Sequence, residues 1–235
     1  MAILPFAFTS LLLNYQKTFG PVIPIDLNAP NVCRLDLTAQ NPLLANRSLK
    51  NTAEFELLIN ELLQLQSATV GVGGFLEDRV IYRRSALFTE NQSNRSIHLG
   101  VDIWAQAGTP VLAPLDGIVH SFADNAHFGD YGPTIILQHS LEGYIFYTLY
   151  GHFSRCSLVN LEVGQQIKKG QEFSTFGPYP ENGDWPPHLH FQLITDMQGL
   201  SGDFPGVCSP KDKATYELIC LDPNLILQSR YLTAF

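Results

Sequence analysis

The chain has 235 residues, of which 45% are apolar and 15% are charged, and its formal net charge at pH 7 is −8. This composition excludes an intrinsically disordered chain, and the length allows one large or two small domains with a substantial core. No run of Lys or Arg exceeds two residues, so we expect no nucleic-acid partner. The 15 prolines and 18 glycines lie among β-branched and aromatic residues, which favours many short strands over a helical bundle.

The N-terminal stretch and the cysteines give information on the cellular location of the protein. Ile3–Leu13 is apolar but too short to span a bilayer, and no Lys or Arg precedes it as in a secretion signal. We therefore interpret it as part of the fold, and we expect no membrane span and a cytoplasmic location, with an extracellular or periplasmic one as the alternative. The cysteines are too far apart for a zinc knuckle, and we expect free thiols at Cys33, Cys156, Cys208 and Cys220.

One helix and a series of strands are predicted along the chain. Residues 51–66 carry apolar side chains at helical spacing, and Asn51 followed by Glu54 resembles a capping box. From about residue 78 the pattern is that of short strands between turns, which indicates a mainly β protein with an antiparallel β sandwich or half-barrel core. The predicted strands include residues 79–82, 111–113, 117–119, 134–137, 144–149, 163–171 and 172–177.

The most informative stretch is residues 185–193, which read Trp-Pro-Pro-His-Leu-His-Phe-Gln-Leu. On a β-strand, His188, His190 and Gln192 share one face, while the apolar side chains between them share the other. The two prolines mark the start of the strand, because proline cannot donate to a ladder. Two imidazoles on one strand face suit a zinc site, although a His-x-His pair alone is more often structural.

His98 and Asp102 form a second candidate pair, with Gly100 midway between them. On an ideal strand their Cα atoms would lie roughly 13 Å apart, which is too far for both side chains to reach one ion. Glycine permits a bend that shortens this distance, so we place the pair at a kinked strand entry. Three other histidines, His120, His127 and His139, have no such companions and are expected at the surface or in the core.

A third motif lies between the first two along the chain. In order, the motifs are His98-Leu99-Gly100-Val101-Asp102, Tyr150-Gly151-His152 and Pro187-His188-Leu189-His190-Phe191. Together they resemble peptidase family M23, the zinc metallopeptidases that include the lysostaphin-like and LytM-like endopeptidases. The resemblance covers roughly residues 90–195. The chain, including residues 220–225, is also similar to M23-like modules that are joined to aminotransferase-like domains, and such proteins look cytoplasmic.

The resemblance implies a zinc-dependent metalloendopeptidase that hydrolyses peptide bonds in peptidoglycan cross-links or a related peptide. His98, Asp102 and His190 match the zinc ligands of the family, and His152 and His188 match its two catalytic histidines. This set agrees with the chemistry, because two imidazoles and one carboxylate leave a fourth tetrahedral position for water. Zinc lowers the pKa of such a water to about 7, and a neighbouring histidine can accept its proton.

The resemblance divides the chain into three parts. Residues 1–85 are an N-terminal α+β segment of unknown role, residues 86–200 are the peptidase core, and residues 201–235 are a tail that packs on the core. The segment 1–85 is expected to pack on the core; the alternative is latency, in which one of its loop Asn or Asp residues takes the fourth metal position. Trp104 and Trp185 flank the site in sequence and suit either a groove wall or packing.

Two other classes of protein fit parts of the sequence. Residues 110–119 and 163–170 resemble the hairpins of biotinyl or lipoyl carriers, but no exposed lysine tip is evident and the placed His and Asp residues stay unexplained. An M23-like metal-binding module without peptidase activity, which binds peptide or glycan, is the alternative to the enzyme. Zinc content separates the carrier from the other two, and peptide turnover separates enzyme from binding module. The sequence does not set the oligomeric state.

Overall fold

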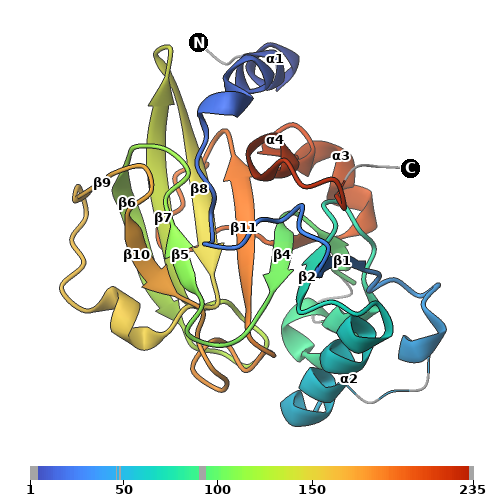
Figure 1. Cartoon of the computed structure of the whole chain (residues 1–235). Helices are drawn as coiled ribbons and strands as arrows, with labels where there is room; N and C mark the ends of the chain where they lie inside the picture. Colours follow the sequence, from blue (N-terminus) through green and yellow to red (C-terminus); the bar gives the residue numbers. More distant parts are fainter. Residues whose placement is uncertain (1–4, 46, 48, 90–93, 233–235) are drawn as a thin grey trace.

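The computed structural model describes residues 5–45, 47, 49–89 and 94–232. Counted over these residues, its largest sheet has nine strands, is open at both edges and is antiparallel except for the pair β1–β2 (Figure 1). The order is β1 (Val32–Leu35), β2 (Val70–Gly73), β4 (Val101–Trp104), β11 (His188–Ile194), β8 (Tyr144–Gly151), β7 (Gly132–Leu141), β6 (Gly117–Asn125) and β9 (Gln166–Ile167), with β13 (Cys220–Leu221) beside β11. The predicted mainly β class is confirmed.

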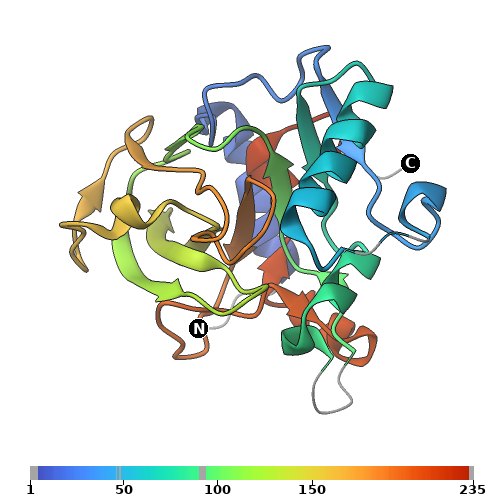
Figure 2. The same cartoon turned by 90° about the horizontal axis from the view of Figure 1, so that it is seen from below.

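A two-stranded sheet packs on the curved large sheet. It consists of β5 (Pro110–Leu112) and β10 (Glu172–Thr175), which pair antiparallel (Figures 1 and 2). Val111 of β5 belongs to the same buried cluster as Ile135 of β7 and Phe191 of β11. The main core therefore lies between the two sheets, which agrees with the predicted sandwich or half-barrel.

The centre of the large sheet follows from local sequence. Strands β7 and β8 form the predicted hairpin, whose turn residues Glu142 and Gly143 have φ values of 49° and 81°. Positive φ at both positions matches the right-handed twist of the flanking strands. All seven residues of β11 are buried, because β4 and β8 pair with its two edges and core residues cover its faces. The strand begins at His188, directly after the two prolines, as predicted.

The N-terminal segment contributes strands to the same sheet. Strand β2 pairs antiparallel with β4, which brings Gly73 opposite Asp102. Helix α2 (Thr52–Leu65) lies against β1 and β2 (Figure 1) and confirms the predicted helix, since the Asn51 side chain accepts hydrogen bonds from the first backbone N–H groups. Its buried face consists of Thr52, Phe55, Leu58, Ile59, Leu62 and Leu63. Strands β1 and β2 thus extend the sheet that carries the histidine motifs.

Two predicted strands are wrong in extent or type. Residues 79–82 make only an isolated bridge, Thr38 to Arg79, and then enter the 3-10 helix η3 (Val80–Arg84). The reason is that the Arg79 side chain turns inward to buried carboxylates, and the following backbone leaves the sheet. Of residues 163–171, only β9 is a strand; Gly164 and Gly170, with φ values of 86° and 76°, form turns on either side of it.

The C-terminal part also joins the β structure. Strand β12 (Val207–Cys208) pairs with β3 (Ile97–His98), and β13 pairs with β11. The other helices are α1 (Pro5–Tyr15), α3 (Lys213–Tyr216) and α4 (Asn224–Leu227), with short 3-10 helices at Gln16–Thr18, Pro42–Leu44, Ala86–Phe88, Arg155–Leu158 and Pro210–Asp212. Within the described ranges, no helix is both long and apolar enough to cross a bilayer. The four cysteines are free thiols, as expected, and the three-part division of the chain stays a prediction.

Candidate metal centre

Three buried side chains from neighbouring strands converge at one point. His98 ends β3, Asp102 lies on β4 and His190 lies on β11, directly opposite Asp102 in the strand register. The expected bend is present at Gly100, between β3 and β4. A Cβ atom on Gly100 would lie 2.7 Å from ring atoms of His190, so glycine both permits the bend and leaves room for the imidazole. The bend and the register together assemble the group.

The three inward-facing atoms form a nearly equilateral triangle. His98 Nε2 lies 3.0 Å from His190 Nδ1, and Asp102 Oδ1 lies 3.2 Å from each of these nitrogens. Ligand atoms of a tetrahedral centre with bonds of about 2.0–2.1 Å are roughly 3.3 Å apart. Asp102 Oδ1 is buried and accepts no hydrogen bond. The triangle therefore has the size and the unsatisfied acceptor that a metal ion requires.

Hydrogen bonds on the outer side of each ring set the tautomers. His98 Nδ1 lies 3.0 Å from the Gly74 carbonyl, which can only accept, so Nδ1 carries the proton. His190 Nε2 lies 2.9 Å from Gln192 Oε1, whose amide nitrogen is used as a donor to Pro205 O. Both rings thus present a lone pair to the centre, as ligating histidines do when an outer partner holds the other nitrogen.

The electrostatics of the group suit a cation. Burial lowers the pKa of His98 to about 3, and the positive charge of Arg79 acts in the same direction. Burial opposes ionisation of Asp102, yet His98 and Arg79 hold its pKa well below the ordinary value. At neutral pH His98 is therefore a neutral imidazole and Asp102 a carboxylate, which are the forms that bind metals.

Two more histidines lie beside the triangle. His188, on β11, has Nδ1 2.7 Å from Pro186 O, and His152, just after β8, has Nδ1 2.9 Å from Asn182 O. Both rings therefore keep Nε2 as the free acceptor. His188 Nε2 lies 4.0 Å from Asp102 Oδ1. The ring centroids of His152 and His188 are 4.1 Å apart. Burial lowers the pKa of His188 to about 4 and that of His152 well below its usual value.

Two tryptophans hold these rings in place. Trp104 stacks on His188 with centroids 4.0 Å apart and an interplanar angle of 16°, and Trp185 contacts both histidines edge-on. Phe55 of α2 in turn packs against both indoles. Trp104 and Trp185 are only 1% and 3% exposed, which supports packing for both, and Trp185 also lines the pocket beside the site.

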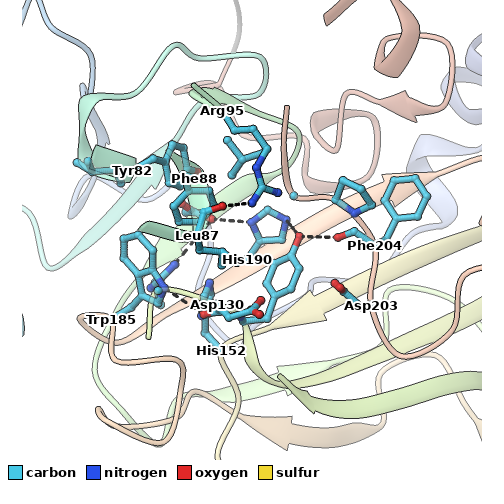
Figure 3. A pocket seen from close by; sticks show the side chains of 18 residues that line it. Tyr82, Leu87, Phe88, Arg95, Asp130, His152, Trp185, His190, Asp203 and Phe204 are labelled. Carbon is cyan, nitrogen blue, oxygen red and sulfur yellow. Dashed lines mark hydrogen bonds and ion pairs between the residues drawn. The ribbon is translucent and has the colours of Figure 1, made fainter. Parts of the chain in front are cut away.

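A pocket of about 140 Å³ opens onto the site. Asp102, His152, His188 and His190 are among the residues that line it, and Figure 3 labels His152 and His190. Aromatic and acidic side chains line the rest, including Tyr82, Phe88, Tyr131, Asp130, Asp203 and Phe204. Of residues 1–85, the described lining residues are Ile81 and Tyr82, so the described part of this segment places no Asn or Asp in the pocket. The latency alternative thus gains no support.

The structure brings together all five of the site residues expected from sequence. His98, Asp102 and His190 form the group that could hold a metal, and His152 and His188 stand next to it. The residues that hydrogen-bond to these side chains from outside the triangle were not identified from the sequence. Arg79 and Gly74 O had no motif to mark them, whereas Gln192 shares the predicted strand face of His190 and so carried a signal.

His139 lies outside the site and gives the stability a pH dependence. It is buried on β7, its Nδ1 lies 2.9 Å from Asp116 O, and burial lowers its pKa from 6.5 to about 4. In the unfolded chain the pKa is about 6.5, so the unfolded state binds more protons between these values and the free energy of unfolding falls as the pH falls through this window. We expect His139→Gln to reduce the loss between pH 7 and 5 by roughly 1–2 kcal/mol, measured by denaturant titration. An identical pH dependence in variant and wild type would contradict this assignment.

Comparison with known proteins agrees with the geometry. Residues 96–201 match the model of peptidase family M23. An uncharacterized metalloprotease of Haemophilus influenzae is 39% identical over 115 residues, which are 48% of this chain and 22% of that protein. The L-Ala–D-Glu endopeptidase of Bacillus subtilis is 31% identical over 107 residues, covering 43% of this chain and 31% of that protein. The lysostaphin catalytic domain from Staphylococcus simulans has 27% identity and a TM-score of 0.36, over 53% of this chain and 82% of that chain.

The matched region coincides with the part of the chain that carries the three motifs. Residues 96–201, which contain all five converging side chains, are the part of the chain that matches peptidase family M23. The matches cover between 14% and 31% of the length of the curated relatives, so they concern one part of those proteins. Strands β1 and β2 and Arg79 lie before the matched region.

Proposed function

We propose that the chain is a zinc-dependent endopeptidase that hydrolyses peptide bonds in peptidoglycan cross-links or a related peptide. The observation that carries the proposal is the triangle of two imidazole nitrogens and one unsatisfied carboxylate oxygen beside two further histidines with free Nε2 atoms. The name of the Bacillus subtilis relative, L-Ala–D-Glu endopeptidase, supports the peptidoglycan substrate class.

In this proposal His98, Asp102 and His190 hold the zinc ion. Their donor set of two imidazoles and one carboxylate is that of catalytic zinc sites, which keep a ligand position for water, rather than that of structural sites. When bound, zinc supplies Lewis acidity and lowers the pKa of water toward neutrality. Gly74 O and Gln192 orient the two imidazoles, and the pocket gives a peptide access to the centre.

His152 and His188 carry the proton transfers. Each has its Nδ1–H held by a backbone carbonyl, so each Nε2 presents a lone pair that can accept a proton from the attacking water. Hydrolysis of the amide then requires a proton at the leaving nitrogen, and the histidine that accepted it can return it there. The other histidine can donate a hydrogen bond to the oxyanion only while its Nε2 carries a proton taken up from solvent. The low pKa values keep both rings neutral before the reaction, which suits the proton-accepting role.

The relatives also bear on location. One is a lipoprotein NlpD/LppB homolog of Pseudomonas aeruginosa and another a cell division protein of Caulobacter vibrioides. A lipid chain attaches its protein to a membrane, so the first relative favours the extracellular or periplasmic alternative for this chain. The cytoplasmic location expected from the sequence receives no support from these relatives.

Metal removal tests the proposed function. We expect zinc-loaded protein to release peptides from purified peptidoglycan, with each cut creating one new amine and one new carboxylate. Chelation should stop this release because the three side chains cannot activate water alone, and added zinc should restore it. The measurement is mass spectrometry of the released fragments. Stoichiometric zinc with tight fragment binding but without any cleavage would instead support the binding module without peptidase activity.

A further inference from the structure

A buried arginine contacts the carboxylate of the proposed metal site. The Arg79 side chain is completely buried, and its Nη1 donates a hydrogen bond to Asp102 Oδ2. Its Nε donates to Glu77 Oε2 at 2.8 Å, so the guanidinium is held between two carboxylates. Arg79 lies before the region that matches the M23 model and belongs to none of the motifs.

The two oxygens of Asp102 therefore have different partners. Oδ1 lies in the triangle with the two imidazole nitrogens and accepts no hydrogen bond, whereas Oδ2 is bound by Arg79. We infer that Arg79 is a positioning residue that holds Asp102 as a ligand through one oxygen only. This inference rests on the proposed zinc site. Its consequence is that the carboxylate cannot rotate to bind through both oxygens, which keeps a coordination position for water.

Neighbouring residues also hold the Arg79 guanidinium in place. Gly73 lies opposite Asp102 in the β2–β4 register, and a Cβ atom there would lie 2.5 Å from Arg79 Nη2. Tyr82 Oη, 3.4 Å from Arg79 Nη1, lies on another side. A side chain at position 73 would therefore push the guanidinium away from its present place beside Asp102. The planar fork of Arg suits this two-carboxylate site, whereas the single ammonium of Lys cannot reproduce its geometry.

The positioning role has a direct test in metal affinity. Arg79→Lys keeps the charge but loses the fork, so we expect zinc binding to weaken by about 10–100-fold, the usual effect of changing an outer partner of a ligand. The measurement is competition with a chelator of known zinc affinity on the full chain. Arg84→Lys is the matched control, because Arg84 is also buried but donates to Lys50 O and Thr52 Oγ1, and within the described residues it bonds to no side chain of the triangle. The control should bind zinc with wild-type affinity.

A second measurement uses the wild-type protein, so it does not depend on whether Arg79→Lys folds. X-ray absorption at the zinc edge of the loaded wild type should give one Asp102 oxygen at about 2.0 Å and no second carboxylate oxygen within bonding distance. A two-oxygen carboxylate ligand would overturn the inference, as would wild-type zinc affinity in Arg79→Lys. In both cases the zinc site itself would stand. If the wild type holds no zinc at all, the proposed function and this inference fall together.

Discussion

His190→Ala is expected to abolish zinc binding, from about one ion per chain to essentially none. The substitution removes one of three protein ligand atoms, and a change in an outer partner alone already costs about 10–100-fold in affinity. Two ligand atoms remain, His98 Nε2 and Asp102 Oδ1, which lie 3.2 Å apart. Both come from the same side of the site, and β11 then contributes no ligand. Elemental analysis of dialysed protein, with circular dichroism to confirm the fold, measures this outcome.

His139→Ala is the matched control for this experiment. His139 is likewise a buried histidine of the large sheet, but it bonds to Asp116 O and Thr148 rather than to the triangle. The control should lose stability and keep its zinc. Full zinc occupancy in His190→Ala would contradict the assignment of this ligand.

His188→Ala and His152→Ala are expected to keep zinc but to slow peptide hydrolysis by about 10²–10⁴-fold, the usual contribution of a general acid–base group. Neither side chain belongs to the triangle, so the metal should stay. Because the rings lie 4.1 Å apart and are proposed to act in one reaction, their effects should not add. The double variant should therefore be little slower than the more damaged single variant.

The kinetic comparison has its own control and its own contrary outcome. His120→Ala changes a half-buried histidine on β6 that contacts Ser121 and Tyr147, and it should leave kcat unchanged. Initial rates at saturating peptide, with zinc content measured on the same samples, separate loss of chemistry from loss of metal. Wild-type turnover by either alanine variant would show that its histidine has no part in the proton transfers.

Local patterns in the sequence account for most of the candidate site. Alternation along residues 188–192 places His188, His190 and Gln192 on one strand face, and prolines define where that strand begins. Gly100 marks the bend that brings His98 and Asp102 together. The helix at residues 51–66 and the hairpin around Glu142 also follow from period and turn chemistry. These features depend on neighbours in the chain, which is why the sequence predicts them.

Features that depend on contacts between distant segments could not be predicted. Arg79 meets Asp102 across 23 positions, and the pattern of residues 79–82 reads as a strand although the structure has a 3-10 helix there. The Gly74 carbonyl that orients His98 has no side chain to mark it. The sequence also gives no sign that β1 and β2 extend the sheet that carries the candidate site, because register between segments is set by packing.

The metal position is the central claim, and anomalous scattering tests it most directly. Crystals of zinc-loaded protein, measured on both sides of the zinc absorption edge, should show one strong peak per chain. We expect that peak about 2.0–2.2 Å from His98 Nε2, Asp102 Oδ1 and His190 Nδ1, with His152 and His188 outside bonding distance. A peak bonded to His152 or His188 in place of one of these three atoms, or no peak in the triangle, would contradict the account.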